Sequence, residues 1–221
     1  MCGRFYLDVQ PDELLSHFGL EVVPDLVPRY NIAPSQSVPA ILSGSRGREM
    51  RMLRWGLIPS WAKDEKIGYR TINARAETVE TKPAFRTAFR NHRCLIPASG
   101  FYEWRAGPDG KQPYCIHPKQ RAFFVFAGLY EHWRDRAGKT IDSCTILVTQ
   151  ANPVVQPVHD RMPVILTPEN YAAWLDPHTK DPAVLKPLLR PAPADEIDLY
   201  PVSKRVNSPK NDDPECIAPL G

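Results

Sequence analysis

The sequence predicts an α+β fold whose middle is dominated by strands, and three observations lead to this prediction. The chain has 221 residues, of which 43% are hydrophobic, and this is enough apolar material for the core of one large domain. Apolar or alternating runs of strand length, separated by turn sequences, follow one another between residues 94 and 149. The 24 prolines are scattered along the chain, so they indicate many short elements and no proline-rich linker.

Four short segments are predicted to be helices. The segment 11–19 (PDELLSHFG) has apolar residues at helical spacing, a proline at its start and a glycine at its end. The segment 83–91 is typical of a short basic helix. Thr167 is an N-cap residue before a proline, and it opens a helix that runs to about residue 175. The last helix, over residues 181–190, is interrupted by a proline.

Further segments have the apolar or alternating pattern of strands. They cover residues 38–43, 52–58, 94–98, 100–104, 114–117, 122–130, 141–149 and 162–166. Residues 59–82 are expected to be irregular. So is most of the proline-rich chain after residue 191, which would leave a short irregular tail after about residue 211. No strong domain boundary interrupts the pattern, so we expect a single domain over residues 1–221.

Composition excludes several classes of protein. The longest apolar run, residues 122–130, is nine residues long, whereas a helix needs about 20 to span a bilayer. No basic and then apolar leader follows Met1, so we expect a soluble cytoplasmic protein without a membrane partner. The five cysteines are an odd number, contain no CxxC pair and have no histidine at zinc-like spacing. We therefore expect no disulfide framework, no metal and no cofactor.

The charge is distributed unevenly. Residues 46–105 hold ten arginines and three lysines against six acidic residues, a net charge of +7, while the whole chain carries only +3. Such a segment is typical either of a solvated face or of a groove that binds a polyanion, and charge alone leaves both interpretations open.

Cys2 is the cysteine with a chemically distinctive position. Removal of the initiator methionine, which is normal before a small residue, would leave a free α-amine and a thiol on adjacent carbons. With a pKa of about 7.7–8.0, that amine is partly neutral near pH 7, and the thiol is a second nucleophile in the same residue. A 1,2-aminothiol traps an aldehyde: the amine forms a Schiff base, the sulfur adds to the imine carbon, and a thiazolidine ring closes. Position alone leaves open that Cys2 is an ordinary second residue.

Three stretches place polar side chains where a turn or core is expected. Asn73 and Arg75 lie two residues apart, on one side of the chain if it is extended. Glu103 stands among aromatic residues, and burial there would raise its pKa and suit it to proton transfer; an exposed position on the alternate face is the other interpretation. His159 and Arg161 flank an aspartate just before a predicted strand, as a catalytic cluster or a salt-bridged turn would.

Taken together, these stretches resemble the SRAP family, the SOS-response-associated peptidases, whose members are abasic-site processing proteins. The resemblance runs from residue 2 to about residue 211 through seven motifs in order. They are MCGRF (1–5), RYNIAP (29–34), RWGLIPSW (54–61), NARAE (73–77), GFYEW (100–104), HDRMP (159–163) and VSKRVNSPKN (202–211). The family fold implies a barrel-like mixed β core with short flanking helices.

The resemblance implies a chemistry and a set of catalytic residues. Family members shield abasic sites in single-stranded DNA through a covalent thiazolidine crosslink to the N-terminal cysteine, here Cys2. By resemblance, Glu103 is the acid and base of the proton transfers, His159 assists it, and Asn73 orients the amine and the sugar hydroxyl. The same Schiff base permits β-elimination, so weak lyase activity is also expected.

The resemblance also implies a path for the DNA. Arg75 and Arg161 are expected on the phosphates that flank the lesion, with Arg4 nearby, because arginine suits bidentate phosphate contact. Trp61 is expected to stack on an adjacent base. Some relatives carry a second tryptophan at the next position, which is alanine here. Lys82 is a weaker phosphate candidate. The expected partner is single-stranded DNA with abasic sites, bound by a monomer in a bacterial cytoplasm, at the nucleoid when DNA is damaged.

Three other functions compete with this interpretation. The first is an amide hydrolase with an N-terminal cysteine, but such glutamine amidotransferases carry an Asn-Gly element, and no Asn-Gly dipeptide occurs in this chain. The second is a peptidase that uses Cys2, His159 and Glu103. Removal of Met1 is the only peptidase reaction that the sequence itself calls for. The third is a non-catalytic single-strand binding module in which Cys2 is incidental.

Overall fold

A computed structural model describes residues 2–108 and 110–220 of the chain. Its strands are β1 (Phe5–Leu7), β2 (Arg29–Ile32), β3 (Ser37–Gly44), β4 (Gly47–Trp55), β5 (Asn73–Arg75), β6 (Arg93–Ala98), β7 (Gly100–Gly107), β8 (Gly110–Pro118), β9 (Phe124–Arg134), β10 (Thr140–Gln150), β11 (Arg161–Pro163) and β12 (Ile197–Pro201). Its α-helices are α1 (Pro11–Phe18), α2 (Arg86–Asn91), α3 (Pro168–Leu175) and α4 (Pro182–Leu185). Short 3-10 turns connect some of them.

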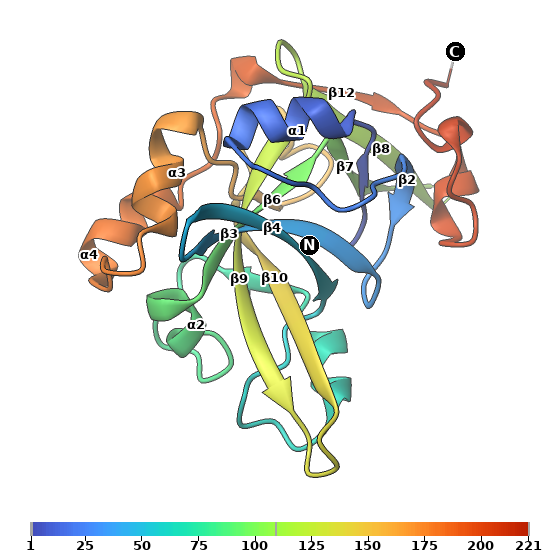
Figure 1. Cartoon of the computed structure of the whole chain (residues 1–221). Coiled ribbons are helices and arrows are strands. Elements are labelled where there is room, and N and C mark those ends of the chain that lie inside the picture. The colour runs from blue at the N-terminus through green and yellow to red at the C-terminus, as the bar shows by residue number, and fades with distance from the viewer. Residues whose placement is uncertain (1, 109, 221) are drawn as a thin grey trace.

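Five strands close into a barrel. The order is β10–β4–β3–β6–β9, and β9 returns to pair with β10. The barrel is mixed because β10 runs parallel to β4 and antiparallel to β9. Two short strands extend along β10, with β5 parallel to it and β11 antiparallel. The α+β class with a barrel-like mixed β core and short helices is thereby confirmed (Figure 1).

A second, antiparallel sheet carries the N-terminal segment onto the barrel. Its order is β12–β8–β7–β1–β2. Phe5 of β1 joins the two sheets, because its ring centroid lies 5.2 Å from that of Trp55 and 6.1 Å from that of Phe126 in the barrel. Gly100 allows β1 to approach β7, since a Cβ at this position would lie 2.5 Å from both the Ile116 carbonyl oxygen and the ring of Tyr6.

The helices largely follow their sequence signals, and α2 and α3 pack against β6 of the barrel. α1 starts at a proline and ends at Gly19, which adopts the left-handed conformation (φ 63°) that glycine tolerates best. α3 occupies the predicted residues. The segment expected as a helix over 181–190 contains only α4 and a following 3-10 turn, Lys186–Leu188, because the proline at 187 cannot continue the α-helical hydrogen bonds. No helix among the described residues has the length and apolarity needed to cross a membrane.

Four strands escaped the sequence prediction: β1, β2, β5 and β12. β5 and the 3-10 turn Glu65–Arg70 lie within the segment 59–82 that was expected to be irregular, so that expectation is wrong there. β12 lies in the proline-rich region after residue 191 and pairs with β8 along its whole length. These strands are three to five residues long, too short for a period of two to be recognised.

The C-terminal segment packs against β2, beside which it lies in Figure 1. The Asp212 carboxylate accepts hydrogen bonds from the backbone N–H groups of Tyr30 and Asn31. A 3-10 turn, Pro214–Cys216, follows, and Cys216 is completely buried beside Tyr102. Cys94, Cys115 and Cys144 are also buried, as their apolar strands predict.

Candidate active site

The N-terminal segment lies alongside Glu103. Phe5 pairs with Phe101 across β1 and β7, and the Tyr102 N–H donates to the Arg4 carbonyl oxygen at 3.0 Å. Continuing this antiparallel register by one residue places Gly3 opposite Glu103. Cys2 is completely buried at this end of the strand pair, with its Sγ 3.8 Å from the Arg4 carbonyl oxygen.

The thiol of Cys2 is held in its protonated form. Burial raises its pKa far above the usual range, and the nearby Glu103 carboxylate raises it further. Cysteines that act as free-standing nucleophiles have the opposite surroundings, namely positive groups that lower the thiol pKa. Cys2 therefore needs a base to take its proton whenever its sulfur forms a bond.

Glu103 is a buried carboxyl poised to exchange protons at neutral pH. It lies on the central strand β7, and only 2% of its surface is exposed. Burial raises its pKa to about 7, so that both protonation states are populated near neutrality. Of the two positions that the sequence left open, the structure therefore contains the buried one.

His159 is brought to Glu103 by a turn that follows β10. Asn152 organises this turn: its Oδ1 accepts hydrogen bonds from the Val154 and Val155 N–H groups, and the His159 N–H donates to the Val155 carbonyl. The His159 Nε2 lies 3.9 Å from Glu103 Oε2. Burial lowers the pKa of the imidazole, which favours its neutral form.

The hydrogen bonds of His159 fix its tautomer. Nδ1 accepts the Arg161 backbone N–H at 3.0 Å, so in the neutral ring the proton is on Nε2 and faces Glu103. Asp160 Oδ1 also lies 3.0 Å from Nδ1, but this carboxylate bonds Nδ1 only in the imidazolium. The neutral form is favoured because burial lowers the pKa of the imidazole.

Asn73 has a buried side-chain amide without a hydrogen-bond partner. It lies on β5, opposite Ile146 of β10, and is 8% exposed. Neither its Oδ1 nor its Nδ2 finds a partner among the described residues. An unsatisfied buried polar group costs about 1–3 kcal/mol, so this amide is available for a ligand at a cost to stability.

A surface pocket opens at Glu103 and His159. Three residues that the sequence analysis did not single out complete its lining: Trp104, Lys111 and Asn207. The Trp104 Nε1–H donates to Asn207 Oδ1 at 2.7 Å, which joins β7 to the C-terminal region. Trp104 and Asn207 fall inside motifs noted in the sequence, whereas Lys111 carried no signal except its place after a hairpin turn.

Two predicted phosphate-binding residues lie on the strands beside the C-terminal end of β10. Arg75 of β5 pairs with Val148, and Arg161 of β11 pairs with Gln150. Arg75 is exposed, whereas Arg161 is largely buried and forms an ion pair with Glu77. A phosphate at Arg161 would therefore compete with a carboxylate.

The remaining residues that are predicted to contact DNA differ in their exposure. Trp61 is 59% exposed, on a loop that the Trp133 Nε1–H anchors through the Ala62 carbonyl at 2.8 Å. Lys82 is also exposed. Arg4, in contrast, is half-buried, and its Nη1 donates to Asn31 Oδ1 and to the Val206 carbonyl. The contacts of these residues with DNA stay predictions.

The arginine-rich segment 46–105 is not one uniform face. Arg93 is 4% exposed, and its guanidinium donates only to backbone carbonyls, those of Phe89, Arg90, Trp174, Asp176 and Thr179. These hydrogen bonds join β6 to α2 and to the end of α3, so Arg93 has a structural role. The interpretation of the whole segment as a groove wall is therefore too broad, and only its exposed members are available to a polyanion.

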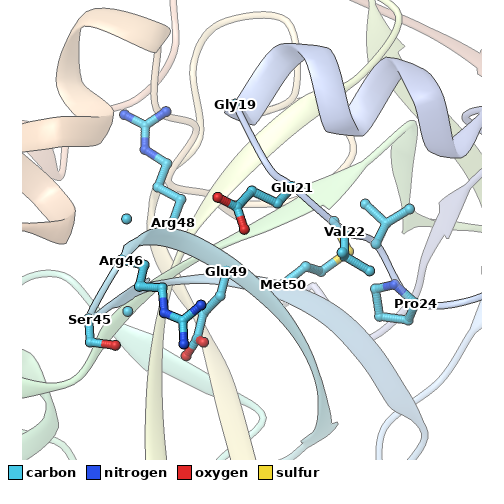
Figure 2. A pocket seen from close by; sticks show the side chains of 12 residues that line it. Gly19, Glu21, Val22, Pro24, Ser45, Arg46, Arg48, Glu49 and Met50 are labelled. Carbon is cyan, nitrogen blue, oxygen red and sulfur yellow. The ribbon is translucent and has the colours of Figure 1, made fainter.

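A second hollow lies away from these residues. It is formed by residues 19–24 after α1 and by the β3–β4 hairpin, and Glu21, Arg46 and Glu49 are among its lining residues (Figure 2). None of the predicted site residues lines it. Within the described residues, no group of three or more histidine, cysteine or acidic side chains has a geometry that could hold a metal ion.

Comparisons with known proteins agree with the motifs. The family model for SOS response associated peptidases (SRAP) matches residues 1–209. The abasic site processing protein YoqW of Bacillus subtilis is 48% identical over 221 residues, covering 98% of this chain and 99% of that protein. The abasic site processing protein HMCES of Gallus gallus is 33% identical, covering 87% of this chain and 66% of that protein.

A solved structure has the same fold. The crystal structure of a protein from Bacteroides thetaiotaomicron superimposes with a TM-score of 0.90 at 29% identity, covering 99% of this chain and all of that one. The family match spans nearly the whole chain, and the buried Cys2 and Glu103 lie within it. The chain therefore belongs to the SOS response associated peptidase (SRAP) family.

Proposed function

We propose that this protein processes abasic sites in single-stranded DNA by forming a thiazolidine crosslink between Cys2 and the aldehyde of the lesion. The observation that carries the proposal is the juxtaposition of the buried Cys2 thiol with a carboxyl, Glu103, whose pKa is about 7. Relatives from bacteria to vertebrates are named abasic site processing proteins. Removal of Met1 would supply the α-amine that the reaction needs.

The reaction balances with the groups that this site contains. The α-amine attacks the C1′ aldehyde of the opened sugar and gives a carbinolamine. Protonated Glu103 donates a proton to the departing hydroxyl, and loss of water leaves a protonated imine. The resulting Glu103 carboxylate then accepts the thiol proton while sulfur bonds to the imine carbon, and the ring nitrogen keeps the proton that it already carries. The sum is aldehyde plus aminothiol giving thiazolidine and water, without an oxidant or reductant.

His159 and Asn73 have supporting roles in this proposal. The neutral His159 carries its proton on the nitrogen that faces Glu103, so it can donate to the sugar ring oxygen or relay a proton. The unpartnered amide of Asn73 offers both a donor and an acceptor to the amine and the sugar hydroxyl. The imine would also permit β-elimination, which would appear as weak lyase activity.

The pKa of Cys2 favours this chemistry over a cysteine hydrolase. A hydrolase nucleophile must be a thiolate when it attacks, whereas burial and Glu103 raise the pKa of this thiol. In the crosslinking route the amine attacks first, and the sulfur gives up its proton only when Glu103 has become a base. Peptidase action beyond removal of Met1 has no such support.

The DNA would follow the cations beside β10 and the exposed Trp61. Arg75 and Arg161 beside β10 would bind flanking phosphates, with Lys82 as a weaker contact, and Trp61 would stack on a neighbouring base. We expect the protein to act as a monomer, without metal or cofactor, in the bacterial cytoplasm.

A denaturing gel tests the proposal. Mature protein is incubated with a single-stranded oligonucleotide that contains one abasic site, and the mixture is heated before electrophoresis. We expect a heat-stable shifted band for the wild type and for Cys216→Ala, which removes a thiol elsewhere. Cys2→Ala and Cys2→Ser keep the α-amine but lack the sulfur, so each should give no heat-stable band and only an imine that borohydride must trap. Absence of a band with correctly processed wild type would contradict the proposal.

A further inference from the structure

A completely buried asparagine, Asn31 on β2, is the centre of a hydrogen-bond network around the N-terminal segment. Its Oδ1 accepts from Arg4 Nη1 at 2.6 Å. Its Nδ2 faces three backbone carbonyl oxygens, those of Val206 at 3.2 Å, Ser208 at 2.9 Å and Asn211 at 2.6 Å. The single amide therefore joins the beginning of the described chain to a segment about two hundred residues away.

Arg4 transmits this anchoring to the nucleophile. Its Nη1 also donates to the Val206 carbonyl at 2.7 Å, so the guanidinium is held between β2 and the C-terminal region. Its backbone carbonyl, in turn, accepts the Tyr102 N–H and lies 3.8 Å from Cys2 Sγ. The side chain and the carbonyl of Arg4 are thus both held in place, two residues from Cys2.

The 204–212 segment closes the network from the other side. Its last residue, Asp212, accepts the Tyr30 and Asn31 N–H groups and forms an ion pair with Arg29. In the middle of the segment, Asn207 accepts the Trp104 indole N–H and lines the pocket at Glu103 and His159. One segment therefore both anchors the nucleophile and forms a wall of the pocket.

We propose that Asn31 is a positioning residue for the crosslinking reaction, acting through Arg4 and the 204–212 segment to hold Cys2 against Glu103. This inference rests on the proposed function of the same site. Asn31 is completely buried, and its side-chain bonds go to Arg4 and the C-terminal carbonyls, so its effect should fall on the reaction step and not on DNA affinity. A displacement of about 1 Å at a reacting group is enough to cost a large factor in rate.

The test compares Asn31→Ala with Asn91→Ala, a matched control. Asn91 is exposed on α2, where its amide donates only to the Thr87 carbonyl one turn earlier. Affinity is measured with a single-stranded oligonucleotide containing a tetrahydrofuran abasic analogue, which has no aldehyde. The single-turnover crosslinking rate is measured at saturating abasic DNA, at a temperature where circular dichroism shows both variants to be folded.

The expected result is a separation of binding from reaction. Asn31→Ala should crosslink at least about tenfold more slowly while its affinity for the analogue stays within about twofold of wild type. Asn91→Ala should match wild type in both measurements. A folded Asn31→Ala that crosslinks as fast as wild type, or whose rate falls only together with affinity, would overturn the inference.

A milder variant keeps the inference testable if Asn31→Ala does not fold. Asp212→Asn retains one acceptor for the Tyr30 and Asn31 N–H groups but loses the charge that pairs with Arg29. We expect about a threefold loss of rate at unchanged affinity, and no loss would contradict the network. A wild type that forms no crosslink at all would instead contradict the proposed function.

Discussion

Asn31 and Asn73 are two buried asparagines in opposite situations. The amide of Asn31 is fully hydrogen-bonded, because its Oδ1 accepts from Arg4 and its two N–H donors are shared among three carbonyls, whereas neither polar atom of Asn73 has a partner among the described residues. A saturated buried amide fixes a structure, and an unsaturated one lowers stability until a ligand arrives. Glu103 is also buried at a cost to stability, because burial raises its pKa and penalises its charged form.

The largest expected effect comes from removing the unfavourable charge at Glu103. Glu103→Gln should slow crosslinking by about 10²–10⁴-fold, the usual contribution of a general acid or base. The same change should stabilise the fold above pH 7. Holding this carboxyl at a pKa of about 7 in place of its usual 4.5 costs on the order of 3 kcal/mol there.

The sign of this pH dependence is opposite to that of a salt-bridged carboxylate. The folded state keeps this proton up to about pH 7, so the contribution of Glu103 to stability is most favourable below the unfolded value of 4.5 and becomes less favourable as the pH rises toward 7. Urea unfolding at pH 5 and pH 8 measures the difference. Wild type and Glu103→Gln should be similar at pH 5 and differ at pH 8, and an equal gap at both values would contradict the buried-acid description.

The two asparagines should respond in opposite ways to alanine. Asn31→Ala removes the side-chain donor of the Ser208 carbonyl and one hydrogen bond each from the Arg4 guanidinium and the Val206 and Asn211 carbonyls, so it should lower the free energy of unfolding by about 3 kcal/mol. Asn73→Ala removes a group that is already unpaired and should change stability by less than about 1 kcal/mol, while crosslinking slows by about 10²-fold. Urea unfolding and crosslinking rates on the same samples test the pair. Equal destabilisation by both variants would contradict the distinction between a hydrogen-bonded Asn31 and an unpartnered Asn73.

The pH dependence of the crosslinking rate should reveal the ionisation of Glu103. Attack requires a neutral amine, with a pKa of about 7.7–8.0, and dehydration requires protonated Glu103, with a pKa of about 7. The rate should therefore pass through a maximum between about pH 7 and 8 and fall about tenfold for each unit beyond either limb. In Glu103→Gln the rate should no longer fall on the alkaline side, because the carboxyl that loses its proton there is absent. Single-turnover rates between pH 5 and 9 measure both profiles.

The smallest effect is expected at the exposed Trp61, which belongs neither with the hydrogen-bonded Asn31 nor with the unpartnered Asn73. Trp61→Ala should weaken binding to undamaged single-stranded DNA by about 1–3 kcal/mol and leave stability unchanged, because the side chain is 59% exposed. Fluorescence anisotropy with labelled oligonucleotides measures this loss. Tyr69→Ala is a suitable control, since Tyr69 is similarly exposed at 62%. Equal losses for both would mean that stacking is not specific to Trp61.

Much of the fold and part of the site could be predicted from the sequence. The long strands β9 and β10 and the helices α1 and α3 carry local signals of period or capping, and Glu103 is marked by its aromatic neighbours. β12 could not be predicted because its pairing with β8 is made with a distant segment and its own sequence is short. The same holds for Asn31, whose role exists only through carbonyls about 175 to 180 residues later.

The bond between Arg4 and the Val206 carbonyl, 202 residues apart, has a consequence for how the protein is made. During synthesis the N-terminal cysteine leaves the ribosome well before residues 204–212 do. Domains fold as units, and contacts of such long range form late. Under the proposed function, a nascent chain that lacks residues 204–212 would carry an aminothiol not yet aligned with Glu103, and the alignment would follow only when this segment folds onto β2.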